Sequence, residues 1–273
     1  MKKIKVRDIK PDAQLAQRKG WQDVTVRWMV SAEETGSRHG CVAWIEVPPG
    51  VSYDIHRYGE CERVVFVFTG SGEHLDSTRK LPLETGDAIY LAKGQWHGFR
   101  NSGPVPAQLL MLLAPIASPT QAGYEPYRAL AAADGSGDPV VRVSGSVTPE
   151  DPDLRDDQGF IGLHVKWLIN SETAPVEQML FGLSRFDPTG SHVLHRHEHA
   201  EEVIYVIEGL GGLQLNEGYE TPIEPGDLTF CAANEWHGHL AGSTEMKFIF
   251  LYLGAPSLAA AGYDVYEPDT IAH

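Results

Sequence analysis

The sequence predicts an all-β chain made of two tandem jelly-roll barrels that arose by internal duplication. Two observations carry this prediction: the chain repeats itself in order, and each copy is a series of short β-rich segments separated by turn signals. At 273 residues the chain is long enough for two domains of ordinary size, and its apolar fraction of 42% is typical of a globular protein.

The repeat is visible in five segments that recur in the same order. Three of them reappear 139 residues later and two reappear 140 residues later, so one insertion and its reversal account for the drift. Five ordered matches are hard to obtain by chance, and they indicate two copies of one domain. The matched ranges are 27–33 with 166–172, 64–70 with 203–209, 81–87 with 221–227, 95–98 with 235–238, and 122–125 with 261–264.

Within each copy the segments favour strands over helices. Residues 202–207 and 246–253 are rich in β-branched and aromatic side chains. Many short strands at this spacing are typical of an antiparallel sandwich or jelly-roll barrel, and we expect one short helix per copy, near 127–133 and 257–262. The turn signals lie at 187–190, 209–212, 216–218 and 224–227.

Residues 131–139 join the copies with small residues, glycine and proline, which is typical of a linker. We therefore place the boundary near residue 135, with an N-terminal barrel at 1–134 and a C-terminal barrel at 135–273.

Composition narrows the partners and the location. The net charge of −15 disfavours nucleic acid, and no apolar run reaches the ~20 residues of a membrane helix. The N-terminus lacks the apolar core of a secretory signal, and three cysteines without CxxC spacing favour a reducing compartment. We expect a cytoplasmic protein with a small-molecule partner and no membrane or nucleic-acid partner.

A histidine cluster in the second copy has the spacing of a metal site. His195 and His197 are two residues apart, so on a strand both imidazoles point to the same face. Glu202 and His237 come from neighbouring segments and can close around the same cation. Three imidazoles and one carboxylate suit Fe(II), Mn(II), Co(II), Ni(II) or Zn(II), and they leave two positions of an octahedral ion for reactants. A structural zinc site would be closed and usually thiolate-rich, and no cysteine stands at a ligand position.

Other residues are placed by strand parity. His239 shares the parity of His237, so it can orient a substrate or shuttle a proton; the alternative is that it packs or lies at the barrel rim. His192 and His199 are expected at the rim or surface. The expected lining is apolar, which suits an aromatic or enolic substrate, and it consists of Leu194, Val203, Ile204, Phe230 and Leu240.

These residues resemble the two motifs of the cupin superfamily. The first motif is matched by Gly190, His195, His197, Glu202 and Gly209, and the second by Gly226 and His237, while Ala232, Asn234 and Ala241 depart from it. The resemblance implies double-stranded β-helix barrels, and its duplication is similar to that of a bicupin. It implies one divalent metal per chain, held by His195, His197, Glu202 and His237, and a homodimer or higher homo-oligomer.

The first copy fits the motifs less completely. His56 and His97 align with His195 and His237, but Tyr58 and Arg63 stand where His197 and Glu202 would supply ligands. This degenerate site predicts either a structural barrel or a second substrate site in which Arg63, His56 and Tyr58, with His97 nearby, anchor a small carboxylate.

Three functions remain open at this point. The first is an Fe(II)-type dioxygenase acting on a small metal-chelating organic substrate, and it is the one we favour. The second is a redox-neutral enzyme, such as a decarboxylase, isomerase, lyase or hydrolase, that uses Mn(II), Ni(II) or Zn(II) as a Lewis acid. The third is a non-enzymatic small-molecule-binding barrel. The superfamily contains all three classes, so the resemblance does not choose between them.

Overall fold

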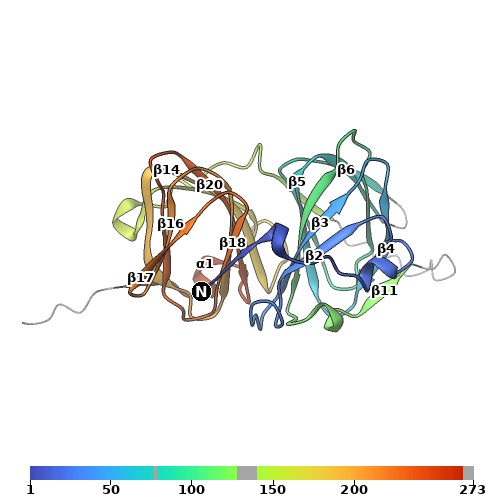
Figure 1. The fold of residues 1–273 in the computed structure, drawn as a ribbon, viewed down its shortest axis with the longest axis horizontal. Helices are drawn as coiled ribbons and strands as arrows, with labels where there is room; N and C mark the ends of the chain where they lie inside the picture. Colours follow the sequence, from blue (N-terminus) through green and yellow to red (C-terminus); the bar gives the residue numbers. More distant parts are fainter. Residues whose placement is uncertain (77–78, 128–139, 267–273) are drawn as a thin grey trace, which may run out of the picture. The chain divides into compact units, whose positions relative to one another are not determined.

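The structure of the chain is a computed structural model that describes residues 1–76, 79–127 and 140–266 (Figure 1). It confirms a nearly all-β chain built from two β-barrel domains. The predicted helix near 257–262 is α1 (Leu258–Ala261), and the side chain of Ser257 accepts from the Ala260 amide to cap it. The predicted helix at 127–133, from residue 128 on, and the boundary near 135 lie outside the described residues.

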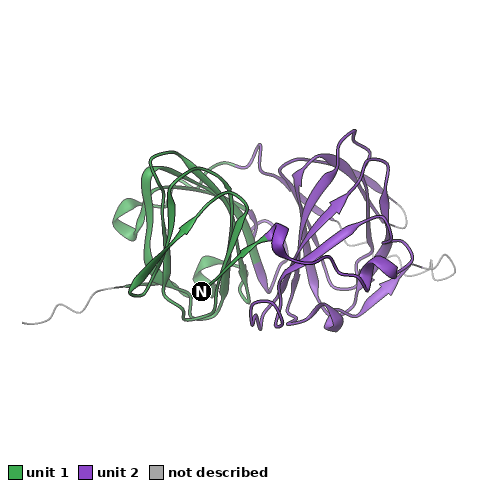
Figure 2. Cartoon of the chain, viewed as in Figure 1, with its two compact units in different colours: residues 1–5, 149–167, 180–273 green, residues 6–148, 168–179 purple. Residues whose placement is uncertain are grey.

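The chain divides into two compact units that do not follow the order of the sequence strictly (Figure 2). Unit 1 consists of residues 1–5, 149–167 and 180–273 and contains most of the C-terminal copy. Unit 2 consists of residues 6–148 and 168–179 and contains most of the N-terminal copy. The assignment of 1–134 and 135–273 to separate domains stays a prediction.

Unit 2 is built from two antiparallel sheets. The six-stranded sheet has the order β12-β8-β5-β10-β3-β2, and the five-stranded sheet has the order β11-β4-β9-β6-β7. Its strands are β2 (Thr25–Val30), β3 (Cys41–Val47), β4 (Ser52–Tyr58), β5 (Glu62–Thr69), β6 (Ser71–Leu75), β7 (Lys80–Glu84), β8 (Asp87–Leu91), β9 (His97–Arg100), β10 (Ala107–Ala114), β11 (Tyr124–Pro126) and β12 (Val141–Ser144), with 3₁₀ turns η1 (Val6–Asp8), η2 (Leu15–Gln17) and η3 (Pro119–Gln121).

Unit 1 repeats this plan, but its two sheets are joined. The main path runs β1-β18-β15-β20-β14-β19-β16-β17, and β13 and β21 pair with β14. Its elements are β1 (Lys2–Lys5), η5 (Asp156–Gln158), β13 (Phe160–Ile169), β14 (Met179–Arg196), β15 (Glu201–Glu208), β16 (Gly212–Asn216), β17 (Tyr219–Ile223), β18 (Asp227–Cys231), β19 (His237–Leu240), β20 (Met246–Leu253) and β21 (Asp264–Val265).

The turn predicted at 187–190 is wrong, because β14 runs through it. Thr189 has a left-handed φ of 63°, which introduces a local irregularity without ending the strand. In the first copy the corresponding chain stops at Val47 and resumes at Ser52, with Pro48, Pro49 and Gly50 between the two strands. The single long strand is what joins the two sheets of unit 1.

A short strand ahead of each repeat is paired in the same register in both units. β1 pairs with β18, from Lys2 opposite Phe230 to Lys5 opposite Asp227, and β12 pairs with β8, from Val141 opposite Tyr90 to Ser144 opposite Asp87. Buried Asp227 lies 3.5 Å from Lys3 Nζ and 3.7 Å from Lys5 Nζ. Asp87 accepts from Arg142 Nη2 at 2.7 Å. Strand β1 therefore completes the unit that carries most of the other repeat.

Each unit has its own apolar core inside the barrel. Trp21, Tyr53 and Phe99 are among the large buried side chains of unit 2, while Phe186, Phe248 and Phe250 belong to the core of unit 1. The three cysteines are free and buried, as expected for a chain without a disulfide framework. No helix within the described residues is long and apolar enough to cross a membrane.

Candidate metal centre

The four predicted ligands of the second copy converge inside unit 1. His195 lies near the end of β14, His197 follows that strand directly, Glu202 is the second residue of β15, and His237 begins β19. One ligand atom from each lies within 4.8 Å of the others. None of the four residues is more than 3% exposed, so the cluster is shielded from water.

Backbone carbonyls fix the orientation of all three imidazoles. Nδ1 of His195 lies 2.8 Å from the Val193 carbonyl oxygen, and Nδ1 of His197 lies 2.7 Å from that of Gly262. Nδ1 of His237 lies 2.7 Å from the Glu235 carbonyl oxygen. A carbonyl can only accept, so each Nδ1 carries a proton and each neutral ring presents an unprotonated Nε2. Such support from outside the ligand set is typical of histidines that bind a metal.

The atoms that face the centre are all acceptors. Glu202 Oε2 lies 3.7 Å from His195 Nε2 and 3.3 Å from His197 Nε2, and it contacts His237 Nε2 directly. Nε2 of His195 and of His197 are buried and have no hydrogen-bond partner within the described chain. Buried acceptors without partners are costly, and a divalent cation would satisfy all four at once. The residues therefore fit a metal ion.

The pKa values of the cluster have the same origin. Burial lowers the pKa of His195 to about 3, with help from the nearby His237. Burial alone would raise the pKa of Glu202, but His237 and the hydrogen bonds of the three imidazoles outweigh it and hold that pKa well below its usual range. The centre thus combines neutral imidazoles with an ionised carboxylate, which are the protonation states that metal binding requires.

A departure from the second cupin motif supports the loop that carries His197. Asn234 stands where the motif has glycine, and it adopts a left-handed φ of 66°, a conformation that asparagine tolerates better than most residues. Its amide donates to the His197 carbonyl at 2.8 Å, and its side chain donates to the Glu198 carbonyl at 3.2 Å. Asparagine therefore makes the turn and also anchors the ligand segment.

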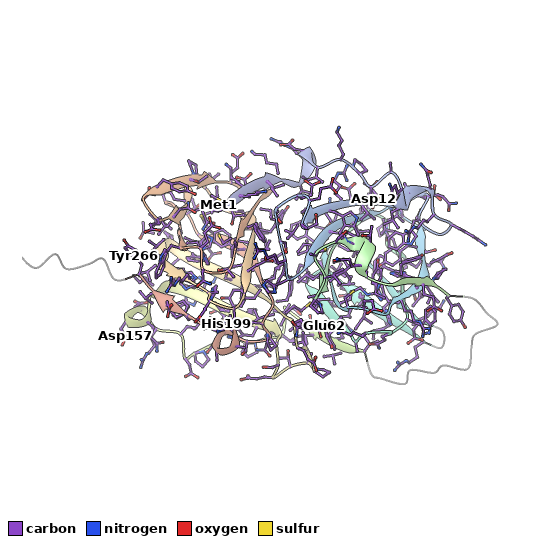
Figure 3. All side chains as sticks on the ribbon, turned by 90° about the horizontal axis from the view of Figure 1, so that it is seen from below. Met1, Asp12, Glu62, Asp157, His199 and Tyr266 are labelled. Carbon is purple, nitrogen blue, oxygen red and sulfur yellow. The ribbon has the colours of Figure 1, made fainter. Side chains whose placement is uncertain are left out.

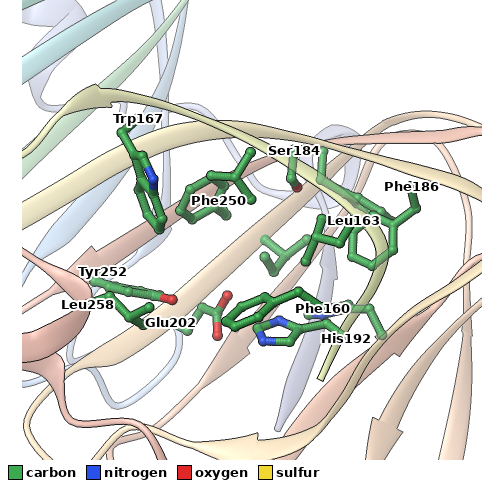
Figure 4. A pocket seen from close by; sticks show the side chains of 14 residues that line it. Phe160, Leu163, Trp167, Ser184, Phe186, His192, Glu202, Phe250, Tyr252 and Leu258 are labelled. Atoms are coloured by element: carbon green, nitrogen blue, oxygen red, sulfur yellow. The ribbon is translucent and has the colours of Figure 1, made fainter. Parts of the chain in front are cut away.

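A narrow cavity of about 30 Å³ reaches Glu202 from inside the barrel (Figure 4). Aromatic rings pack edge to face around it, with Trp167 against Phe250 at 5.3 Å and Phe186 against Phe248 at 5.1 Å between ring centroids. The lining residues are Phe160, Leu163, Val165, Trp167, Ser184, Phe186, His192, Glu202, Ile204, His239, Phe248, Phe250, Tyr252 and Leu258.

The structure places His239 inside the barrel, on the wall of this cavity. It is 2% exposed, and its Nε2 is buried without a hydrogen-bond partner among the described residues. Burial lowers the pKa of His239 to about 4. Its inward position is the one expected from strand parity, whereas the catalytic role assigned to it stays a prediction.

The placement of His192 at the rim or surface is wrong. His192 is 7% exposed, lines the cavity and stacks on His195 with 3.8 Å between ring centroids, and its Nε2 lies 3.1 Å from the Tyr263 hydroxyl. The pairing of β14 with β19 shifts between His192 and His195, and this irregularity reverses the parity that the sequence indicated. His199 is exposed, as expected (Figure 3).

The predicted lining is apolar in character but mostly wrong in its members. Ile204 lines the cavity, whereas Leu194, Val203, Phe230 and Leu240 are not among its lining residues. Sequence reasoning missed Phe160 and Tyr252, which come from strands β13 and β20. Tyr252 is the cross-strand partner of Glu202, a relationship that only the register of β15 and β20 reveals.

The four residues of the predicted second site also come together, inside unit 2. Arg63 Nη1 donates to His56 Nε2 at 2.7 Å, and the guanidinium lies 4.9 Å from the ring centroid of Tyr58. His56 Nδ1 lies 3.0 Å from the Asp54 carbonyl oxygen, which repeats the support of His195 by Val193. A guanidinium donor thus meets the imidazole acceptor that faces the metal centre in the other copy.

His97, the counterpart of His237, has different partners. Its Nε2 lies 2.6 Å from the Tyr53 hydroxyl, and its Nδ1 lies 2.7 Å from Nδ1 of His74. Both ring nitrogens are therefore occupied by hydrogen bonds. Arg63 is 2% exposed and forms no ion pair with a described carboxylate, and its Nε has no partner in the described chain. That these residues anchor a small carboxylate stays a prediction.

The chain is similar to several known proteins. It is 27% identical over 103 residues to the tetracenomycin polyketide synthase protein TcmJ of Streptomyces glaucescens, which covers 38% of this chain and 69% of that protein. It is 24% identical over 111 residues to the oxalate-binding protein of Thermotoga maritima, which covers 40% of this chain and 91% of that protein.

The fold is also similar to that of oxalate decarboxylase from Bacillus subtilis, with a TM-score of 0.65 and 14% identity over 96% of this chain and 78% of that one. Another structure of that enzyme concerns its Mn(II) centres. At this identity the likeness shows the fold alone. The cupin domain profile matches residues 43–113 and 182–252, one segment in each repeat and together just over half of the sequence. The chain therefore belongs to the cupin family and is a bicupin.

Proposed function

We propose that the C-terminal barrel is the centre of a metal-dependent enzyme, and specifically of an Fe(II)-type dioxygenase that acts on a small metal-chelating organic substrate. The observation that carries this proposal is the set of buried, unprotonated imidazole nitrogens and one carboxylate beside an apolar cavity. When bound, a divalent ion supplies Lewis acidity, and iron adds the capacity to activate dioxygen.

The side chains around the cluster have separate tasks in this proposal. The aromatic walls exclude water and hold a flat substrate next to Glu202. His239 has a free Nε2 on the wall, so it can hydrogen-bond the substrate or move a proton at that atom. Tyr263 and Phe160 hold His192 from both sides, and His192 stacks on the ligand His195 and fixes its ring.

A redox-neutral enzyme is the second candidate. The Mn(II) centres named for Bacillus subtilis oxalate decarboxylase, which has the same fold, favour it. Mn(II), Ni(II) or Zn(II) would serve the same four ligands. A non-enzymatic binding barrel is the third candidate, and the similarity to an oxalate-binding protein favours it.

Oxygen uptake separates the first candidate from the others. The protein is prepared without oxygen, loaded with Fe(II) or Mn(II) in parallel, and mixed with catechols, β-diketones and small acids. We expect oxygen consumption with the iron form and a chelating substrate, and none with Glu202→Ala. Turnover by the manganese form without oxygen uptake would establish the redox-neutral function instead. The homodimer and the cytoplasmic location stay predictions, the first of which gel filtration with light scattering would test.

A further inference from the structure

The two repeats provide an internal comparison that shows which cavity residues are specific to the metal-bearing barrel. Tyr252 faces Glu202 across β15 and β20, and its counterpart Leu113 faces Arg63 across β5 and β10. Phe160 corresponds to Trp21, which is fully buried and stacks on Tyr53 at 4.5 Å in the first barrel. The second barrel therefore has a smaller ring where space is needed and a hydroxyl where the first has only carbon.

The Tyr252 hydroxyl is available to a ligand. It lines the cavity and is turned toward Glu202 in Figure 4. The Tyr252 ring is held beside the ligand His197, with 4.4 Å between ring centroids, and it is 3% exposed. Its hydroxyl forms no hydrogen bond with the described part of the chain, so it can donate to an oxygen atom of a bound molecule.

The charges of the cavity limit what that molecule can be. Glu202 is the only acidic side chain of the lining, and no lysine or arginine is present among the residues that line it. A divalent ion and one carboxylate sum to a single positive charge. A ligand with one negative charge would cancel it, whereas a dianion would leave an unpaired negative charge among aromatic rings, which is costly.

We propose that this site takes a planar aromatic or enolic chelator with a single negative charge, such as a catecholate or a β-diketonate, and that the Tyr252 hydroxyl donates a hydrogen bond to one of its oxygens. Oxalate, the dianion in the names of two related proteins, is then a poor ligand for this chain. The inference rests on the metal centre of the proposed function, and it names the class of molecule that the centre accepts.

The test uses the full chain loaded with Zn(II), which binds without oxygen chemistry, and 4-nitrocatechol as the probe. Zinc content is measured first by elemental analysis, and binding is then followed by the absorbance of the probe. We expect Tyr252→Phe to retain its zinc and to weaken probe binding about tenfold, the usual worth of one hydrogen bond. Tyr205→Phe is the matched control, because Tyr205 is a buried tyrosine of β15 outside the cavity lining, and it should bind like the wild type.

Oxalate is then added as a competitor at concentrations that leave the zinc content unchanged. We expect it to displace the probe only at concentrations at least about tenfold above those at which unlabelled catechol does so, a ratio that corresponds to ~1.4 kcal/mol. Displacement by oxalate at equal or lower concentration, or equal binding by Tyr252→Phe and wild type, would overturn the inference while the metal centre stands. A chain that holds no zinc would overturn the proposed function together with it.

Discussion

Arg63 Nη1 lies 2.7 Å from His56 Nε2, the atom whose counterpart in the second repeat, His195 Nε2, faces the candidate metal centre without a partner. Both imidazoles are oriented by a backbone carbonyl two residues earlier in the chain. The first barrel therefore satisfies its inward acceptor with a cationic side chain, and the second requires a cation from solution.

Restoring two ligands should give the first barrel a metal site. We expect the double variant Tyr58→His/Arg63→Glu to bind a second metal equivalent, weaker than the first because both ring nitrogens of His97 already have partners. The isosteric control Tyr58→Phe/Arg63→Met should stay at one equivalent. Elemental analysis after dialysis measures both, and a restored variant that stays at one equivalent would contradict the idea that Arg63 stands in for a cation.

Metal binding should stabilise the native protein against heat. A ligand at 100 times its dissociation constant adds about 2.7 kcal/mol, so Mn(II) or Zn(II) should raise the Tm, and EDTA should reverse the rise. Glu202→Ala should lose this response. His97→Ala should keep it from a lower starting stability, by about 1–3 kcal/mol, because Tyr53 and His74 lose a buried partner. Circular dichroism follows the transitions, and an equal metal response in Glu202→Ala would argue against the site.

The strand that precedes the second repeat should contribute to stability through Asp87. Arg142 Nη2 donates to Asp87 Oδ2 at 2.7 Å, and the Asp87 side chain is 2% exposed. Arg142→Met should reduce the free energy of unfolding by about 1–2 kcal/mol, because it leaves a buried carboxylate with fewer partners. Urea denaturation checks this. The control Arg155→Met removes an exposed pair with Asp157 and should change little; equal losses in both variants would refute the prediction.

Glu62 should make stability depend on pH. Burial raises the pKa of Glu62, although the amides of Gln178 and Glu177 and the Tyr90 hydroxyl oppose the rise. A raised folded-state pKa contributes stability at pH values below the ordinary carboxyl pKa, and this contribution is lost as pH rises through the folded pKa. Glu62→Gln should therefore gain stability relative to wild type between about pH 4 and pH 7. Parallel urea midpoints for the two proteins across this range would count against it.

Sequence spacing predicted the metal ligands well because all four belong to motifs that are short along the chain. The HxH pair needs only strand parity, and both His195 and His197 are buried at the centre as expected. Parity failed at His192, three residues earlier, because a bulge intervenes between His192 and His195. A single sequence carries no clear signal for such a bulge, so the third inward histidine of this strand went unpredicted.

The walls of the cavity were beyond the reach of sequence reasoning for a different reason. Tyr252 is 50 residues from Glu202 in the sequence, and only their cross-strand pairing brings them together. Similarly, β1 lies at the start of the chain but pairs with β18 in unit 1, which a division of the sequence near residue 135 could not anticipate. Contacts of this kind depend on register and topology, which the repeat alone does not specify.

The metal content of anaerobically purified protein tests the central claim most directly. After incubation with Fe(II) or Mn(II) and removal of excess ion, elemental analysis should find one equivalent per wild-type chain and almost none in His195→Ala/His197→Ala, with circular dichroism confirming that the variant is folded. Stoichiometric metal in that double variant, or none in the wild type, would contradict the assignment of the centre to His195, His197, Glu202 and His237.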